Sequence, residues 1–175
     1  REVEEVIRKL ERILEEAERM SRESERKLRE ILEKLERAIR EIREELERIH
    51  KELEEKAGRD EEVREILKRN RDNIRKLEED ARRILEDLKR LIKKLTDENK
   101  RILDELRRRI DELRKANVDR DRLDKAVEEL RKEIEEMLRR SDELVKRLDE
   151  KVKKVLKELR EHVKRDKEKV DKDAE

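Results

Sequence analysis

Two histidines, His50 and His162, are the residues of this chain whose types and spacing come closest to metal chemistry. His50 ends the tetrapeptide Glu-Arg-Ile-His, and a glutamate three residues before a histidine is the spacing found in di-iron helical bundles. His162 lies one helical turn before Asp166, so the two side chains could contact one ion. Leu159 stands where a second Glu-x-x-His motif would need its glutamate. We therefore expect no metal site, and we interpret both histidines as structural core residues.

Nucleophilic catalysis is the second chemistry to consider, because the chain contains serines, histidines and many carboxylates. A triad needs a serine, a histidine and an aspartate within hydrogen-bond reach of one another. The serines Ser21, Ser24 and Ser141 lie far along the predicted helices from both histidines. A continuous three-helix core also offers no pocket for a substrate. We expect no catalytic residue, no cofactor and no enzymatic activity.

The composition restricts the class of protein. The 175 residues include 55 Lys and Arg and 54 Asp and Glu, which gives a formal net charge of +1. Charged residues make up 62% of the chain, against about 25% in an average globular protein. This composition suits either disorder or a narrow helical bundle. The apolar residues are strictly periodic, and periodicity favours the bundle.

Several partners and environments are disfavoured by the same composition. No apolar run approaches the roughly 20 residues of a membrane span, and we expect no signal peptide. The absence of cysteine excludes disulfides and thiolate metal sites. Acidic residues interrupt the locally basic stretches, so the sequence does not indicate nucleic-acid binding. The sequence predicts solubility but leaves the localisation undetermined.

Apolar residues recur every seven residues and predict three helices of nearly equal length, at about 2–57, 60–116 and 119–172. The apolar face drifts round the heptad, which indicates a weak supercoil. Gly58 and Asp60 predict the end of one helix and the start of the next, and Asn117 and Asp119 do the same at the second loop. Short loops make neighbouring helices antiparallel. The expected fold is an all-α, up-down-up three-helix bundle, with residues 1–175 as a single domain.

Polar residues interrupt this apolar pattern at two levels. If the helices fold back at the two loops, Ser21, Thr96 and Ser141 fall at one level, with Ser24 and Asn99 within a turn of it. Hydroxyls and an amide can satisfy one another, whereas a lone buried hydroxyl is costly. We therefore predict a buried hydrogen-bond network there. A second predicted layer, near the first loop, has the members His50, Asn70, Asn73 and His162.

These features resemble a de novo designed helical bundle of the parametric type with buried hydrogen-bond networks. The resemblance covers all 175 residues and rests on uniform Glu/Lys/Arg surfaces, Leu/Ile/Val cores, matched helix lengths, minimal capped loops and clustered polar core residues. Natural three-helix bundles such as spectrin repeats typically carry core tryptophans, and this chain has no aromatic residue. The resemblance implies an idealised, usually very stable protein that was built to test folding rules or to serve as a scaffold.

The expected function is accordingly structural. We expect no natural biochemical activity, a monomer, and no protein, nucleic-acid or membrane partner. The alternative is a designed partner-binding or pH-responsive assembly module that uses the same polar layers, with self-association as one form of it. Buried histidines disfavour protonation, which is why the second layer suggests a response to pH.

Overall fold

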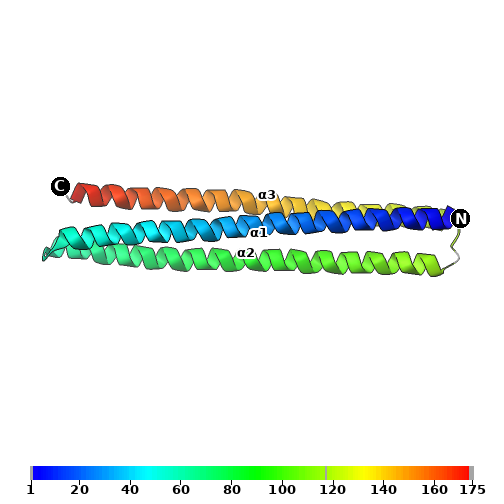
Figure 1. Cartoon of the computed structure of the whole chain (residues 1–175), viewed down its shortest axis with the longest axis horizontal. Coiled ribbons are helices and arrows are strands. Elements are labelled where there is room, and N and C mark those ends of the chain that lie inside the picture. Colours follow the sequence, from blue (N-terminus) through cyan, green and yellow to red (C-terminus); the bar gives the residue numbers. More distant parts are fainter. Residues whose placement is uncertain (1, 117, 174–175) are drawn as a thin grey trace. The chain divides into compact units, whose positions relative to one another are not determined.

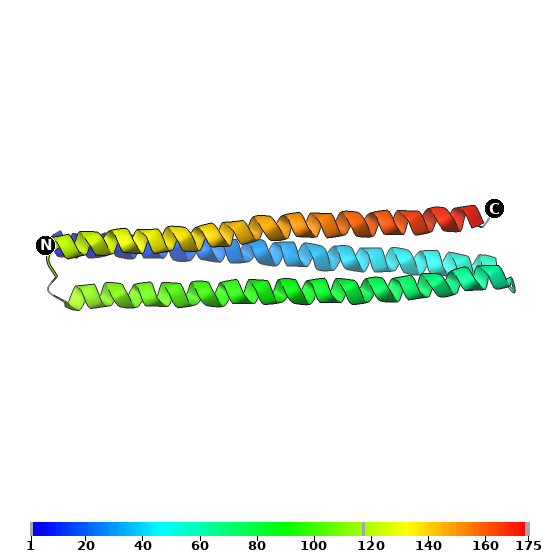
Figure 2. The same ribbon diagram turned by 180° about the vertical axis from the view of Figure 1, so that it is seen from behind.

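The computed structural model describes residues 2–116 and 118–173, except for the side chains of residues 57, 166 and 169–173. The described residues form three α-helices: α1 (Glu2–Ala57), α2 (Glu61–Lys115) and α3 (Arg120–Asp173). Figure 1 labels the three helices and colours them along the chain from blue (α1) to red (the end of α3), and Figure 2 shows from behind that each ribbon is unbroken. The predicted all-α three-helix bundle is confirmed, with helix boundaries within about one residue of those expected from the sequence.

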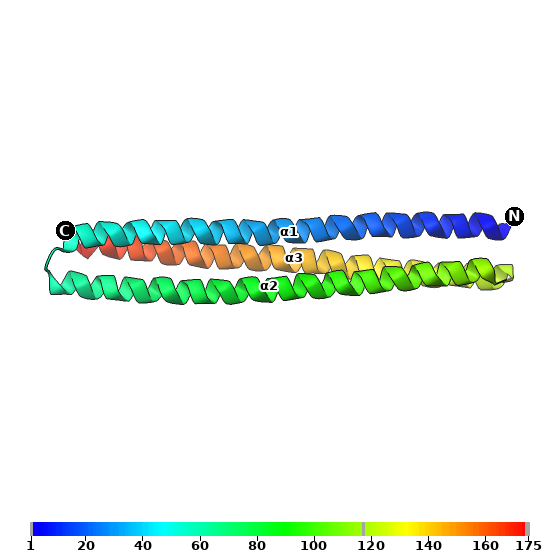
Figure 3. The same cartoon turned by 60° about the horizontal axis from the view of Figure 1, so that its bottom comes forward.

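The first loop has the local chemistry that its sequence predicts. Gly58 has a φ of 50°, a left-handed conformation that few residues other than glycine adopt readily. Asp60 then caps α2, because its Oδ1 accepts a hydrogen bond of 3.2 Å from the backbone N–H of Glu62. The first turn of α2 also carries Glu61 and Glu62, whose negative charges suit a helix N-terminus. Figure 3 shows the resulting short connection between α1 and α2.

The second loop is also capped by an aspartate. Asp119 Oδ1 accepts a hydrogen bond of 2.9 Å from the backbone N–H of Arg122, three residues on. The backbone N–H of Val118 donates to the carbonyl of Ala116 at 2.9 Å. The predicted role of Asn117 as a C-terminal cap lies outside the described residues.

Contacts divide the chain into two compact units, and each contains a segment of all three helices. Unit 1 consists of Arg1–Arg29 and Arg90–Arg147. Unit 2 consists of Glu30–Lys89 and Leu148–Glu175. Each unit therefore has its own core. The prediction that residues 1–175 act as one domain stays a prediction.

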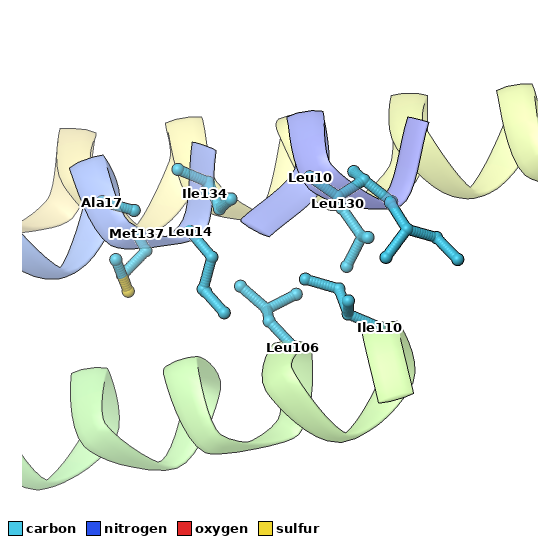
Figure 4. Close-up of a cluster of buried hydrophobic side chains, with 9 residues drawn as sticks. Leu10, Leu14, Ala17, Leu106, Ile110, Leu130, Ile134 and Met137 are labelled. Atoms are coloured by element: carbon cyan, nitrogen blue, oxygen red, sulfur yellow. The ribbon is translucent and has the colours of Figure 1, made fainter. Parts of the chain in front are cut away.

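The core of unit 1 consists of aliphatic side chains from all three helices. Figure 4 shows side chains of α1, α2 and α3 that point toward one another, and an apolar stripe on each helix predicts this arrangement. Leu106 of α2 and Met137 of α3 are completely buried in it. The buried members of this cluster are Ile7, Leu10, Leu14, Ala17, Leu106, Ile110, Leu130, Ile134 and Met137.

The core of unit 2 is built mainly by α1 and α3. The corresponding part of α2 contributes residues that are only partly buried, among them Ile66, Ile74 and Leu77. In α3, Leu156 is buried, whereas its neighbour Val155 and the next apolar residue Leu159 are only partly buried. The buried apolar residues of this unit are Leu35, Ala38, Ile42, Leu46, Ile49, Leu53, Ala81, Leu88, Leu148, Val152, Leu156 and Val163.

Ion pairs between α1 and α2 show the register of these two helices. In each of four pairs a glutamate of α1 faces an arginine or lysine of α2, and the two residue numbers add up to 125. A constant sum is what two antiparallel helices in fixed register produce. The glutamates are 7 or 18 residues apart, about two or five helical turns, so they lie on one face of α1. The pairs are Glu11–Arg114 and Glu18–Arg107 in unit 1, and Glu36–Lys89 and Glu54–Arg71 in unit 2.

Candidate functional site: two buried polar layers

The central layer, which we define as Ser21, Asn99 and Ser141, joins all three helices within unit 1. The side-chain Nδ2 of Asn99 donates one hydrogen bond to Ser21 Oγ at 3.3 Å and another to Ser141 Oγ at 3.0 Å. The three residues are 2%, 2% and 0% exposed, respectively. Both N–H groups of the Asn99 amide are thus satisfied without water, in the part of the core where an unsatisfied donor would be most costly.

Ser141 extends the central layer to a backbone carbonyl. Its hydroxyl donates a hydrogen bond of 3.0 Å to the carbonyl oxygen of Met137, one turn earlier in α3. The hydroxyl therefore accepts from Asn99 and donates to Met137 at the same time. Such chains of hydrogen bonds polarise one another, and a complete chain favours one arrangement of its members.

Two residues that the sequence predicts in this network, Thr96 and Ser24, form no hydrogen bond with Asn99 among the described residues. The prediction that Thr96 belongs to the network is wrong, because its hydroxyl donates to the carbonyl oxygen of Ile92 at 2.9 Å and its side chain is only partly buried. A threonine hydroxyl readily reaches the carbonyl four residues earlier in its own helix. Ser24 is buried, but among the described residues no hydrogen bond joins it to Asn99. The longer Asn99 side chain reaches both serines instead.

The second layer differs more strongly from its prediction. Asn70 is buried and His50 is mostly buried, with 15% of its side chain exposed. The predictions that Asn73 and His162 are buried are wrong, because both are exposed. Each lies one residue before an apolar residue that points inward, Ile74 or Val163, and one residue rotates a helix by about 100°. The side chain of Asp166, which we expected near His162, lies outside the described residues.

His50 takes part in a small polar cluster between α1 and α2. Its Nε2 lies 3.1 Å from Glu54 Oε1 and 3.2 Å from Arg71 Nε, and a terminal nitrogen of Arg71 donates to the same Glu54 oxygen at 3.1 Å. Nε2 can accept from Arg71 or donate to Glu54, but it cannot do both at once. The bond from Arg71 to Glu54 therefore forms together with only one of the two contacts of His50 Nε2.

The inner side of the second layer is not satisfied. Among the described residues, two buried side-chain polar atoms have no hydrogen-bond partner, and both are nitrogens: His50 Nδ1 and Asn70 Nδ2. Burying a polar group without a partner costs about 1–3 kcal/mol. The central layer in unit 1 differs from the second layer in unit 2, because both N–H groups of its buried Asn99 amide are hydrogen bonded.

One ion pair between α2 and α3 was not apparent from the sequence. A terminal nitrogen of Arg109 donates to both carboxylate oxygens of Glu133, at 2.8 and 2.9 Å. This hydrogen bonding, together with the nearby negative charges of Glu133, Glu105 and Glu129, raises the pKa of Arg109 above its ordinary value, although partial burial opposes the shift. Arg109 lies 10 residues after Asn99, and Glu133 lies 8 residues before Ser141, as antiparallel helices require. Counting levels from the second loop could therefore have identified this pair.

The chemistry that the described residues can perform is limited. Among them, no group of three or more histidine, aspartate and glutamate side chains could hold a metal ion. Ser21, Ser24 and Ser141 belong to unit 1, whereas His50 and His162 belong to unit 2. None of the described helices carries an apolar stretch long enough to cross a membrane. What the two layers offer is directional hydrogen bonding between helices.

The chain was also compared with known proteins. No protein-family model matches the sequence, and neither a curated protein nor a solved structure shows significant similarity to it.

Proposed function

We propose that this chain is a structural protein, a designed helical-bundle scaffold in which the central layer fixes how the three helices face one another. The observation that carries this proposal is the Asn99 amide, which donates to a serine of α1 and to a serine of α3 in a fully buried setting. The proposed function is to form this fold and to hold the three helices in one arrangement. We propose no reaction and no natural ligand for it.

The physical basis is that aliphatic stripes alone specify register poorly. A ladder of leucine and isoleucine that repeats every seven residues packs almost as well after a slip of one heptad. A buried asparagine with dedicated partners does not, because a slip leaves Asn99, Ser21 and Ser141 unsatisfied. A single polar residue in an apolar core position can fix register and oligomeric state at some cost in stability.

The charged surface supports the same proposal. The four glutamate–cation pairs between α1 and α2 share one register, so a slip would separate all of them. Exposed ion pairs contribute little stability individually, typically about 0.2–1 kcal/mol. Their effect on pairing specificity is larger, because a slip also brings like charges together.

The experiment compares the parent with the variant Ser21→Ala, Asn99→Leu, Ser141→Ala. Light scattering at micromolar concentration should give a single monomer of 21.7 kDa for the parent. We expect the variant to be as stable as the parent or more stable, because it buries no unsatisfied group. We also expect it to lose specificity, seen as additional oligomers or as more than one set of amide resonances.

Two results would contradict the proposal. One is a parent that is itself dimeric or trimeric. The other is a variant that stays a single monomer with one sharp set of resonances, because the layer would then specify nothing. Asn73→Leu serves as the matched control, since it places the same side chain on an exposed position of α2.

The second candidate function is a partner-binding or pH-responsive assembly module. The incomplete second layer favours it, because the buried His50 Nδ1 and Asn70 Nδ2 have no hydrogen-bond partner in the described structure. Only one of the two histidines lies in this layer, since His162 is exposed. Light scattering at about pH 7.5 and pH 5 tests this candidate directly. A mass that changes between the two values supports it, and a monomer at both values rejects the pH-responsive form.

A further inference from the structure

A groove between α1 and α3 in unit 2 is lined almost entirely by cations. Five of its seven lining residues are basic, one is acidic (Glu161) and one is apolar (Leu156). The whole chain, by contrast, is nearly neutral, with a formal net charge of +1. We call this feature the basic groove, and its cations are Lys34 of α1 and Lys153, Lys157, Arg160 and Lys164 of α3.

Most of these cations are not used by the fold. Lys153 pairs with Asp149 at 3.0 Å on its own helix, and both side chains are well exposed. Among the described residues, no ion pair joins the other four cations of the basic groove to a carboxylate. By contrast, in the four α1–α2 pairs described above, each arginine or lysine of α2 is paired with a glutamate of α1. The basic groove therefore has an excess of cations over carboxylates, with five basic residues against Glu161, and the structure gives direct ion pairing for Lys153 alone among the five described cations.

The shape of the basic groove suits an elongated partner. Leu156 is buried and lines the groove. Lysine side chains generally cover apolar surface with their methylene stems and keep the ammonium group in water. The four α3 cations are spaced i, i+4, i+7 and i+11 and so lie along one face of the helix. At 1.5 Å per residue, the last three lie about 6, 10.5 and 16.5 Å along the helix axis from Lys153.

A second helix reproduces this spacing with its own side chains. Carboxylates at i, i+4, i+7 and i+11 of a partner helix have the same axial offsets, so each can meet one cation of the groove. The pattern of steps (four, three, four) reads the same in both directions, and a partner helix can therefore lie parallel or antiparallel to α3. Single-stranded nucleic acid fits less well, because the chain has no aromatic side chain on which a base could stack.

We infer that the basic groove binds an acidic helical segment of a partner protein, with Lys157, Arg160 and Lys164 as the central contacts. The partner presents aspartate or glutamate at the spacing given above and packs its aliphatic stems against those of the lysines. This surface belongs to unit 2, whereas the central layer belongs to unit 1. The inference goes beyond the proposed scaffold function, and either can fail without the other.

The test uses the full chain and a fluorescein-labelled, alanine-rich helical peptide that carries glutamates at i, i+4, i+7 and i+11. Fluorescence anisotropy at an ionic strength of about 0.05 M should show saturable binding that weakens as salt is added. The variant Lys157→Glu, Arg160→Glu should bind the peptide at least about tenfold more weakly, because two attractions become repulsions. The control variant Lys151→Glu, Lys154→Glu makes the same change in net charge on exposed positions of α3 outside the groove, and we expect a loss below about threefold.

Two further arms separate an acidic helix from any polyanion. A peptide with the same composition, but with its glutamates distributed round the helix, should bind at least about fivefold more weakly than the patterned peptide. A short duplex DNA should not compete with the patterned peptide at equal charge. The inference is overturned if the parent shows no saturable binding, if the two variants lose affinity equally, or if the scrambled peptide or the DNA binds as well as the patterned peptide. Circular dichroism of both variants confirms that any loss arises in a folded chain.

Discussion

The side-chain amide of Asn99 donates a hydrogen bond of 3.0 Å to the hydroxyl of Ser141, and this bond joins α2 to α3 inside unit 1. The other N–H of the same amide is bonded to Ser21 on α1. Because the Asn99 side chain donates to serines on two other helices, its removal breaks both hydrogen bonds at once. The stability of the chain should therefore respond to Asn99 much more strongly than to a surface asparagine.

The first prediction concerns this asparagine. Asn99→Leu should lower the free energy of unfolding by about 1–3 kcal/mol, because it leaves buried hydroxyls without their donor and crowds the layer with a branched side chain. Chemical denaturation measures the change. The control is Asn73→Leu on the exposed face of α2, which should stay within about 0.5 kcal/mol of the parent. Equal losses in the two variants would show that the central layer contributes nothing specific.

The second prediction is that the same substitution has the opposite sign at Asn70. The Nδ2 group of Asn70 is buried without a partner, so Asn70→Leu removes a desolvation cost and adds apolar contact. We expect the free energy of unfolding to rise by about 1–2 kcal/mol, with an unchanged denaturant m-value. A loss as large as that of Asn99→Leu would mean that Asn70 is hydrogen bonded in solution.

The third prediction tests the register of α1 and α2 through the pair Glu11–Arg114. Glu11→Arg alone places two like charges together and should cost about 0.5 kcal/mol. Adding Arg114→Glu reverses the pair and should restore most of the loss, with a coupling energy of about 0.2–1 kcal/mol in a double-mutant cycle. Glu15 lies one turn further along α1, and a cycle between Glu15→Arg and Arg114→Glu should show a clearly smaller coupling.

The fourth prediction concerns pH and the pair Arg109–Glu133. The pKa of Arg109 is raised above its ordinary value, chiefly by the hydrogen bond to Glu133. A group whose folded-state pKa is raised contributes stability that is fully present below its unfolded pKa and is lost only as the pH rises through the folded value. The stabilising contribution of Arg109 should therefore be constant between about pH 7 and pH 10.

The measurement compares the parent with Arg109→Met at both pH values. The difference in unfolding free energy should be small, about 0.2–1 kcal/mol, because the two side chains are 41% and 42% exposed and solvent screens their attraction. A difference that disappears already at pH 10 would show that the charge of Arg109 does not account for it.

The fold was predictable because its determinants are local and repeated. Apolar residues at heptad spacing predict the three helices, and Gly58 with Asp60 predicts the first loop. The apolar stripe of α3 contains both Val155 and Leu156, and sequence alone does not show that Leu156 is the more deeply buried of the two. The sum of 125 shared by four of the α1–α2 ion pairs was also present in the sequence, but it becomes recognisable only once the register is known. The pair Arg43–Glu78 joins the same two helices with an offset of about one turn from the other four.

The polar layers were predictable only in part. Counting levels from the loops locates a partner to within about one turn, which was sufficient to find Ser21 and Ser141 but not to choose Asn99 over Thr96. That choice depends on side-chain length and on the competing carbonyl of Ile92. Burial of Asn73 and His162 was mispredicted because a shift of one residue along a helix rotates a side chain away from the core.

The second layer has no described polar member on α3. Its buried or mostly buried members are His50 of α1 and Asn70 of α2, whereas His162 of α3 is exposed. Completing a layer requires a matched donor and acceptor, and residue types at one level along the helices do not test for that match.

The conformation of Gly58 has a consequence for the chirality of the chain. Its φ of 50° is disfavoured for L-amino acids, and nothing lies within 4 Å of a Cβ built at this position. Any penalty for an L-residue there is thus a backbone penalty, not a clash. The mirror-image enantiomer prefers positive φ, so D-alanine suits this position better than L-alanine does. A chain made by chemical ligation could carry this single stereochemical inversion, and the turn would then be restricted in the unfolded ensemble as well as in the folded one.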